Sequence, residues 1–419
     1  MNVNELILYK DFDKGEILDS LDTVLSGNDV EHTYEWISEL VEFSVHNGFS
    51  GNIWHTYLTY LLVTNENAYS KSCEIVGEVS GSINQFALHD FKIFYNLFKV
   101  DFNKVSKETG VDELSIVSNY VGTSESGKVF NLRIRDRIHS LSNYLSQSEN
   151  EVVFKTEMTR FYKEFGVGTF GLHKAFRIEN KTNTVEIVPI RKIAHVNLDD
   201  LVGYEIPKEK LIANTEAFVD GKKANNCLLF GDAGTGKSSS IKAILNKYYD
   251  KGLRMIELYK HQFQDLNDVI DQIKDRNYKF IIYMDDLSFE EFEIEYKYLK
   301  AVIEGGLERK PDNVLIYATS NRRHLVRETF KDKADRDEEL HTNDTVQEKL
   351  SLVARFGVTI YFGKPEKREF QEIVKALAKR NKVNIAEEQL LLEANKWELN
   401  HGGMSGRSAQ QFIDYLLGK

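Results

Sequence analysis

Hydrophobic residues follow two different patterns in the two parts of the chain. Up to about residue 165, apolar residues recur near the period of an amphipathic helix, as at Ile37, Leu40, Val41 and Phe43. The first proline is Pro189, which is consistent with long uninterrupted helices before it. After about residue 195, short apolar runs alternate with helical patterns, as is typical of a parallel α/β sheet. The patterns predict a helical N-terminal domain followed by an α/β domain.

Five short apolar runs are the candidate strands of this sheet, which we therefore expect to be parallel and five-stranded. They are Leu228–Phe230, Arg254–Leu258, Phe280–Met284, Val314–Ala318 and Val358–Phe362. Before them, Phe176–Asn180 and Thr184–Val188 bracket a turn-rich spacer, which predicts a β-hairpin that ties the two domains together. We expect a helical N-terminal domain (1–165), a hairpin linker (166–195), an α/β core (196–363) and a helical lid (364–419).

One run of eight residues carries the clearest chemical signal. Gly231-Asp232-Ala233-Gly234-Thr235-Gly236-Lys237-Ser238 matches the phosphate-binding pattern G-x-x-x-x-G-K-[ST] in full. It lies between a short buried strand and a helical pattern that starts at Ser239, so that a phosphate would meet a helix N-terminus. In this pattern Lys237 reaches the β- and γ-phosphates, and the Ser238 hydroxyl is a ligand of Mg²⁺. We expect residues 231–239 to bind a nucleotide rather than form an unoccupied glycine-rich turn.

Two later strands end in polar residues that suit the same chemistry. The apolar run Phe280–Met284 leads directly into Asp285 and Asp286. We expect Asp285 to hold Mg²⁺ and Asp286 to orient and polarise the attacking water. The run Val314–Ala318 is followed by Asn321, which can hydrogen-bond both the γ-phosphate and that water. The structural alternatives are acids that merely end a strand and an asparagine in a turn.

Two arginines near the end of the chain are further candidates. Arg355 follows a helical pattern and precedes the last strand, a placement from which it can reach the γ-phosphate of a neighbouring subunit. The alternative is a surface arginine at a helix C-terminus. Arg407 begins a helix after the run 402–406 and can contact the same phosphates.

Taken in this order, these residues resemble the AAA+ ATPases over about residues 195–419. The resemblance implies the following roles: Walker A at 231–238, Walker B at 280–286, sensor 1 at Asn321, the arginine finger at Arg355 and sensor 2 at Arg407. It also implies that Val202 and Gly203, within the segment 201–204, pack against adenine, and that ATP and Mg²⁺ are the cofactors.

The chain is closer still to one bacterial AAA+ family, called domain of unknown function 815. The similarity lies in the runs Ala224–Gly231, Ala318–Leu325 and Glu348–Leu352. This family implies an α/β P-loop NTPase core with a helical lid and ATP binding, and it implies no substrate.

The sequence departs from most AAA+ motors at two places. Asp286 stands where most of them carry glutamate, and its shorter side chain lies about one methylene further from the water, which favours the alternative of slow hydrolysis. After the candidate strand Arg254–Leu258, the run Tyr259–Asp265 contains no aromatic–apolar–glycine loop of the kind that grips polypeptide. A protein-unfolding role is thereby weakened.

Charge and composition narrow the partners. The net charge is −11, and the first fifty residues alone carry −9, which opposes non-specific binding to nucleic acid or anionic lipid there. Alternating basic residues from Arg133 to His139 indicate a solvated face or, as the alternative, a contact patch for nucleic acid or a partner. Two cysteines, no Cys/His cluster, no signal peptide and no membrane-length apolar run lead us to expect a cytoplasmic protein without membrane association.

We expect an ATP-binding protein that hydrolyses ATP with Mg²⁺, completes its site with an arginine finger in trans and therefore forms a homo-oligomer, as a ring or an open ring. Nucleotide state would then drive remodelling or binding of an unidentified protein partner through the N-terminal domain. Two alternatives stay open: a slowly hydrolysing, ATP-gated switch, and a DNA-associated loader of the replication-initiator type. Nucleic acid is not indicated as a partner.

Overall fold

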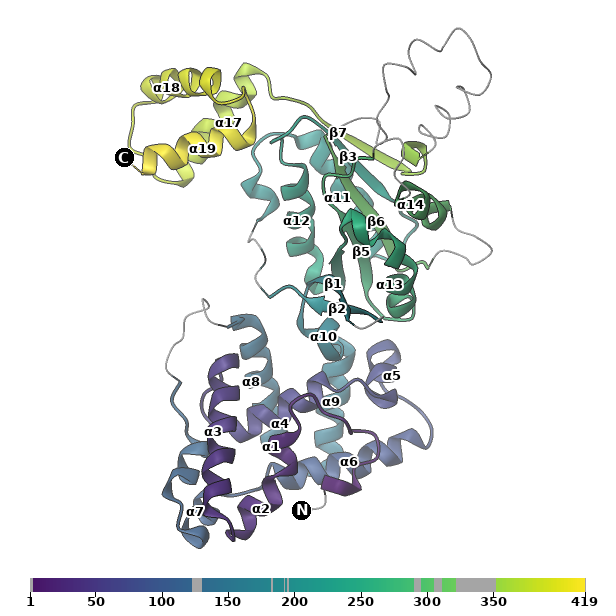
Figure 1. The fold of residues 1–419 in the computed structure, drawn as a ribbon, viewed down its shortest axis with the longest axis vertical. Helices are drawn as coiled ribbons and strands as arrows, with labels where there is room; N and C mark the ends of the chain where they lie inside the picture. Colours follow the sequence, from purple (N-terminus) through teal and green to yellow (C-terminus); the bar gives the residue numbers. More distant parts are fainter. Residues whose placement is uncertain are drawn as a thin grey trace. The chain divides into compact units, whose positions relative to one another are not determined.

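The computed structural model describes residues 3–122, 130–181, 184–191, 193, 196–289, 295–304, 311–321 and 352–418. The chain divides into two compact units, Met1–His173 and Lys174–Lys419 (Figure 1). The first unit is helical, and the second combines a sheet, its flanking helices and a helical lid. Among the described residues, no helix is both long enough and apolar enough to cross a membrane.

The first unit is built from helices, as the periodicity predicts. They are Glu16–Asp19 (α1), Leu21–Ser26 (α2), Val30–Asn47 (α3), Ile53–Thr64 (α4), Ala68–Val76 (α5), Ile83–Leu97 (α6), Phe102–Thr109 (α7), Leu132–Ser146 (α8), Glu151–Phe165 (α9) and Gly168–Leu172 (α10). Asp29, Asn52 and Asp101 cap the N-termini of α3, α4 and α7 with side-chain hydrogen bonds. Gly48 and Gly110 end α3 and α7 in the left-handed conformation that glycine adopts without a steric penalty.

Aromatic side chains form much of the core of this unit. Trp36 and Trp54 are at most 1% exposed and pack with ring centroids 5.7 Å apart, and Phe91 is fully buried. Each indole finds a backbone acceptor, Ile17 O for Trp36 and Leu97 O for Trp54. Phe86, in contrast, is exposed on α6.

A seven-stranded sheet organises the second unit. Its strands are Ala175–Lys181 (β1), Thr184–Pro189 (β2), Cys227–Gly231 (β3), Leu253–Glu257 (β4), Lys279–Met284 (β5), Val314–Ser320 (β6) and Val358–Phe362 (β7). Their order is β2-β1-β4-β5-β6-β3-β7. All neighbouring pairs are parallel except β1 and β2, which form an antiparallel hairpin.

The prediction of a five-stranded sheet is wrong, because the sheet also contains the two strands of this hairpin. The five expected strands are present, but the hairpin also joins the sheet, because β1 pairs in parallel with β4 in the register Ala175↔Met255. The hairpin that we expected as a linker thus covers an edge of β4 that would otherwise expose unpaired backbone groups.

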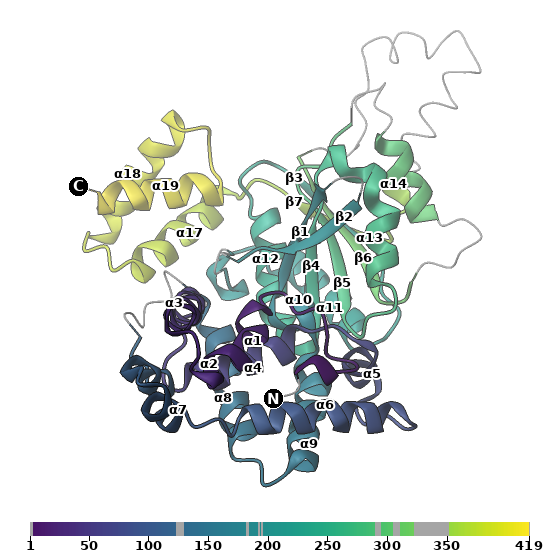
Figure 2. The ribbon, with the colours of Figure 1, turned by 60° about the horizontal axis from the view of Figure 1, so that its bottom comes forward.

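Helices cover both faces of the sheet (Figure 2). Glu205–Val219 (α11) and Lys237–Tyr248 (α12) pack on one face, where Leu229, Ile281 and Tyr317 contribute to a shared core. Leu266–Ile273 (α13) and Glu295–Glu304 (α14) lie on the opposite face (Figures 1 and 2). Because β5 and β6 are covered on both sides, their residues are almost all buried.

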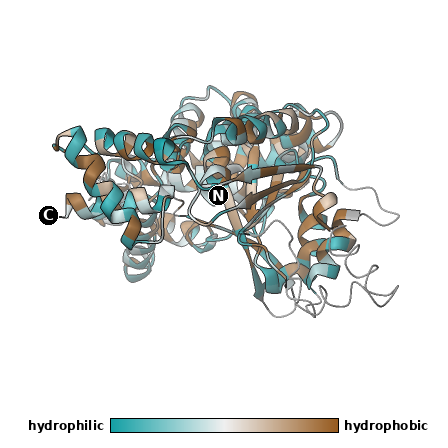
Figure 3. Cartoon of the chain, turned by 90° about the horizontal axis from the view of Figure 1, so that it is seen from above, coloured by the Kyte–Doolittle hydropathy of each residue, from teal (hydrophilic) through white to brown (hydrophobic). Residues whose placement is uncertain are grey.

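The lid consists of Lys367–Arg380 (α17), Glu387–Asn400 (α18) and Gly406–Leu417 (α19), which pack around a small core of their own. Hydrophobic and hydrophilic residues alternate around these helices, as expected for amphipathic helices (Figure 3). The residues from Phe362 to Glu366 connect the last strand to α17 and are called the connector below. An ion pair of 2.9 Å between Arg380 on α17 and Asp200 also joins the lid to the core.

Candidate functional site

The second unit contains a cavity of about 650 Å³ at the carboxyl ends of the central strands. In a parallel α/β sheet this edge is where ligands bind. Its walls come from the segment before α11, the loop between β3 and α12, the ends of β5 and β6, and the lid. The residues that line it include Leu201, Val202, Tyr204, Lys208, Gly234–Ser239, Asp285, Asp286, Thr319, Asn321 and Arg407.

The loop of residues 231–236 turns tightly on its three glycines. Gly231, Gly234 and Gly236 all have positive φ, at +136°, +76° and +91°, where other residues would be strained. A Cβ on Gly231 would also lie 2.1 Å from the carbonyl oxygen of Phe362. The loop ends on α12, which begins at Lys237, so the N-terminus of a helix faces the cavity.

Lys237 is held inside this loop. Its ammonium donates to Gly231 O at 3.0 Å, to Asp232 O at 2.6 Å and to Asn321 Oδ1 at 3.0 Å. Burial lowers the pKa of Lys237 from its ordinary value, and the negative charges of Asp232, Asp286 and Asp285 only partly oppose this. All three ammonium donors therefore have protein acceptors in this structure.

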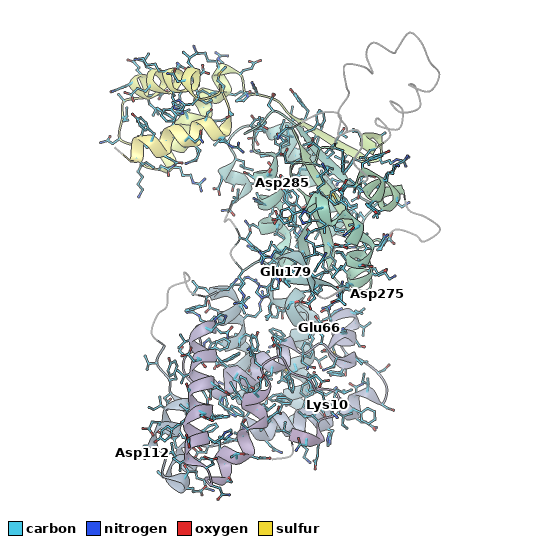
Figure 4. All side chains as sticks on the ribbon, in the orientation of Figure 1. Lys10, Glu66, Asp112, Glu179, Asp275 and Asp285 are labelled. Atoms are coloured by element: carbon cyan, nitrogen blue, oxygen red, sulfur yellow. The ribbon has the colours of Figure 1, made fainter. Side chains whose placement is uncertain are left out.

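Asp285 lies at the end of β5 and faces the start of α12 (Figure 4). The Ser238 hydroxyl donates to Asp285 Oδ1 at 2.7 Å, and the Thr319 hydroxyl of β6 donates to the same oxygen. Desolvation acts to raise the pKa of Asp285, but these hydrogen bonds and the charge of Lys242 outweigh it, so the pKa lies below its ordinary value. The carboxylate is thus held in its ionised form.

Asp286 adopts the left-handed conformation, with φ at +51°. Its backbone N–H donates to Thr319 Oγ1 at 2.9 Å, and its carboxylate accepts a hydrogen bond of 2.7 Å from Asn321 Nδ2. Asn321 thereby bridges Lys237 and Asp286, because its oxygen accepts from the lysine while its nitrogen donates to the acid. The three side chains form one connected network.

The segment 201–204 forms another wall of the cavity, and Val202 lies on it. Gly203 and Tyr204 both have positive φ, and Gly203 is not among the residues that line the cavity. Lys208, only 8% exposed, donates to Leu201 O at 2.7 Å and to Glu205 at 2.9 Å. The Tyr204 hydroxyl donates to Gly363 O, so this segment is also tied to the connector.

The two candidate arginines lie in different places. Arg407, at the start of α19, lines the cavity, and its backbone N–H donates to Gly234 O at 3.1 Å. Arg355 follows the helical residues 352–354 and is not among the residues that line the cavity. The structure therefore brings Arg407 to the other candidate residues, whereas Arg355 is half-buried outside the residues that line the cavity.

Two further residues of the site carried no motif that would identify them. Thr319 contacts both acids, but its position opposite them depends on the register Met284↔Ala318 between β5 and β6. Lys208 reaches the cavity from the interior of α11, where a single lysine gives no distinctive pattern. The sequence offers one signal for Thr319: it is a residue with a hydroxyl group, two positions before Asn321, near the end of β6.

The basic run of α8 is engaged within its own unit. Arg133 donates to Leu172 O at 2.6 Å, Arg135 pairs with Asp136, and the guanidinium of Arg137 lies 4.1 Å from the ring centroid of Phe165. The side chains of Arg133, Arg135 and Arg137 are half-buried, so they do not form the fully solvated face that the alternation predicted.

The residues of the cavity fit a nucleotide with a divalent cation by their chemistry. Glycine backbone, lysine and a helix N-terminus suit phosphate, whereas the oxygen atoms of Ser238 and Asp285 suit Mg²⁺. In the described ranges, no group of three or more His, Cys, Asp or Glu residues could hold a metal ion by itself. A magnesium ion here would need further oxygen ligands from phosphate and water, as is usual for this ion.

Comparisons with known proteins give one family and a distant set of solved structures. No curated protein matches the chain. Similar solved structures include two point mutants of RuvB from Thermotoga maritima, at 17% and 16% identity with TM-scores of 0.37 and 0.36. Each alignment covers 52% of this chain, and it covers 64% and 63% of the RuvB chains, less than two thirds of their length.

A further structure from Thermotoga maritima, titled RuvB Holliday junction branch migration motor, is 15% identical with a TM-score of 0.32, over 52% of this chain and 71% of that one. Similarity at this level says nothing about activity. The sequence model of the family described as Protein of unknown function (DUF815) matches residues 171–419, which is more than half of the chain. The chain therefore belongs to the DUF815 family.

Proposed function

We propose that this protein binds ATP with Mg²⁺ in the cavity of the second unit and hydrolyses the bond between the β- and γ-phosphates. One observation carries the proposal: a loop lysine, a serine–aspartate pair and an aspartate–asparagine pair all lie in the same cavity and are joined by hydrogen bonds. The members are Lys237, Ser238 with Asp285, and Asp286 with Asn321. A purely structural role does not require these groups to converge around a cavity.

Each group has a distinct role in this proposal. Lys237 gives up one of its hydrogen bonds to the protein, such as that to Gly231 O, and donates to phosphate oxygens instead. Arg407 contacts the phosphates from the lid. Ser238 and Asp285 hold Mg²⁺, which when bound neutralises negative charge on the phosphates. Asp286 and Asn321 orient the attacking water, and Asp286 accepts its proton. The backbone of residues 231–239 cradles the phosphates, and Val202 flanks the adenine, with Gly203 as the turn behind it.

Arg355 belongs to this proposal as a residue that acts on a second copy of the chain. Its place in the chain supports that role, because it follows the helical residues 352–354 and only two residues separate it from β7. An arginine supplied in trans raises turnover by about 10³–10⁵ where it stabilises the transferring phosphoryl group. We therefore also propose a homo-oligomer, with the helical first unit as the part that binds a protein partner.

A second candidate function is a slowly hydrolysing, ATP-gated switch. Asp286 is the observation that favours it, because its short carboxylate is already hydrogen-bonded to Asn321 and its backbone is fixed in the left-handed region. A carboxylate held in this way is less available to a water molecule than a longer, free one. Hydrolysis of bound ATP in a single turnover, followed over minutes, distinguishes a switch from a motor that cycles continuously.

Substitution of the loop lysine tests nucleotide binding. In Lys237→Met we expect the Kd for ATP with Mg²⁺ to rise about 10- to 100-fold, because charge-assisted hydrogen bonds to the phosphates are lost. Lys247→Met is the matched control, since Lys247 lies on the same helix but is exposed. Equal affinity of wild type and Lys237→Met, measured by calorimetry, would refute the proposed site.

Two further variants test hydrolysis. Asp286→Asn should bind ATP with a Kd close to that of wild type and hydrolyse it at least about 100-fold more slowly, since general-base catalysis contributes 10²–10⁴. Arg355→Ala should also be slow, and the specific activity of wild type should rise with protein concentration. Full activity of Arg355→Ala, or a specific activity that stays constant across the assembly range, would refute the shared site.

A further inference from the structure

Asp232 occupies a position of the phosphate-binding loop where the motif accepts any residue. A carboxylate is an unfavourable choice there for electrostatic reasons, because it repels the anionic ligand that the loop is proposed to bind. Its presence therefore needs another explanation, and its hydrogen bonds supply one.

Asp232 holds the connector between the sheet and the lid by two hydrogen bonds. Its backbone N–H donates to Phe362 O at 3.0 Å, and its carboxylate oxygen Oδ2 accepts from the backbone N–H of Lys364 at 3.0 Å. Pro365 follows and has no N–H, so the Lys364 amide is the last backbone donor before the capping residue of α17. The bond therefore acts on the chain directly before the first helix of the lid.

The backbone of Asp232 is linked to the phosphate end of the cavity. Its carbonyl oxygen accepts hydrogen bonds from Lys237 Nζ at 2.6 Å and from the Thr235 hydroxyl at 2.8 Å. Because the ammonium of Lys237 has three donors and three protein acceptors, a phosphate oxygen can gain one of its hydrogen bonds only by replacing an acceptor. Two of these three acceptors are the carbonyls of Gly231 and Asp232, in the peptide units on either side of the Asp232 Cα.

The loop has little freedom to absorb such a change by itself. A Cβ on Gly231 would lie 2.1 Å from Phe362 O, which shows how closely the loop backbone approaches the connector. The connector is held from the other side by the Tyr204 hydroxyl, which donates to Gly363 O at 3.1 Å, and by the Tyr204 ring, 5.4 Å from that of Phe362. A shift of the loop at Asp232 therefore meets the connector directly.

We propose that Asp232 is a positioning residue that transmits phosphate occupancy of the loop to the lid, through its carboxylate on the Lys364 amide. This inference rests on the proposed function. When a phosphate takes Lys237 from the loop carbonyls, the peptide units around Asp232 adjust, and the hydrogen bond to Lys364 carries that adjustment to the connector and α17. Asp232 does not contact the reacting atoms in this scheme.

The chain offers a matched control for this bond. Glu369 Oε2 accepts from the backbone N–H of Glu366 at 2.9 Å, which is the equivalent carboxylate–amide bond two residues further along the connector. This bond lies within the cap of α17, and neither of its partners belongs to the phosphate-binding loop. Loss of either carboxylate loosens the connector, but only the loss of Asp232 should uncouple it from the nucleotide.

Hydrogen–deuterium exchange of the full-length protein tests the proposal, with and without a nonhydrolysable ATP analogue and Mg²⁺. The amides of residues 237–241 report occupancy, and those of residues 361–366 report the connector. In wild type we expect the analogue to slow exchange in both segments by at least about tenfold, equivalent to 1.4 kcal/mol. In Asp232→Ala the analogue should still slow exchange in residues 237–241, while it should slow exchange in the connector by less than about twofold.

The conservative variant and the control complete the test. Asp232→Asn keeps an acceptor oxygen and should restore the connector response, and Glu369→Ala should retain it. Connector protection that persists in Asp232→Ala, or is lost equally in Glu369→Ala, would overturn the inference while the proposed function stands. A wild-type protein in which neither segment responds to the analogue would refute the proposed function, and the inference with it.

Discussion

Thr319→Val is the substitution that tests the geometry of the site most sharply. Thr319 is 1% exposed on β6, and its hydroxyl both donates to Asp285 Oδ1 and accepts the backbone N–H of Asp286. Valine keeps the branched shape of threonine and removes only the hydroxyl, so that neither a cavity nor a new clash arises. The variant therefore separates the hydrogen bonds of this residue from its packing.

The structure sets the expected size of the effect. A hydrogen bond to a charged group contributes about 1.5–3 kcal/mol, and the exposure of Asp285 places this one near the lower end. The Asp286 N–H keeps a weaker acceptor, Asp285 Oδ1 at 3.2 Å, so the second loss is smaller. We expect the free energy of unfolding of the second unit to fall by about 1–2 kcal/mol.

The effect on turnover should be larger than the effect on binding. Without its anchor, Asp286 can leave the left-handed conformation, and its carboxylate then no longer has the orientation in which we propose that it positions the attacking water with Asn321. We expect kcat for ATP hydrolysis to fall by at least about tenfold, or 1.4 kcal/mol in activation free energy, while the Kd for ATP changes by less than about threefold.

Urea unfolding, calorimetry and a phosphate-release assay measure the three quantities. Thr215→Val is the matched control. Thr215 lies on α11 and is equally buried, and its hydroxyl makes two hydrogen bonds, to Leu211 O and to the Tyr317 hydroxyl. The control should lose a similar amount of stability and keep its turnover. Unchanged turnover in a folded Thr319→Val, or an equal loss of turnover in the control, would refute the role assigned to Thr319.

Two further predictions concern Asp285 and Lys208. The folded-state pKa of Asp285 lies below its ordinary value near 4, so its contribution to stability is complete above about pH 4 and is lost as the pH falls through the folded-state pKa. Between pH 2 and 6, the free energy of unfolding measured in urea should therefore fall less with decreasing pH in Asp285→Asn than in wild type. The same dependence on pH in both proteins would contradict this. Lys208→Met removes the donor to Leu201 O, and we expect KM for ATP to rise about three- to tenfold with kcat unchanged, since a lost hydrogen bond costs about 0.5–1.5 kcal/mol. Lys210→Met changes an exposed residue of the same helix and should leave both constants unchanged. A fall in kcat alone in Lys208→Met would contradict a role in holding the segment 201–204.

The sequence was most informative where the chemistry is contiguous. The residues from Gly231 to Ser238 follow one another in the chain, so their spacing alone indicates the turn and the helix that follows it. Asp285 and Asn321 could be assigned because each directly follows a strand, and the ends of parallel strands share one edge of the sheet.

The remaining features depend on pairing between distant segments. The turn-rich spacer between two short runs predicts the hairpin, but this pattern is the same in a free hairpin as in one that pairs with β4. Thr319 reaches the acids through the register between β5 and β6, which no local pattern reveals. The bond from Asp232 to the Lys364 amide joins residues 132 positions apart, and a variable position in a motif gives no sign of it.

The pairing of the hairpin with β4 has a practical consequence for dissection of the protein. A shortened chain that starts at residue 196 would lack β1 and β2 and would leave the outer side of β4 with unsatisfied amides and carbonyls. Such a bare strand is a template for another copy, so the fragment should form insoluble aggregates. A fragment that starts at residue 174 keeps both strands and the whole second unit, and we expect it to stay soluble.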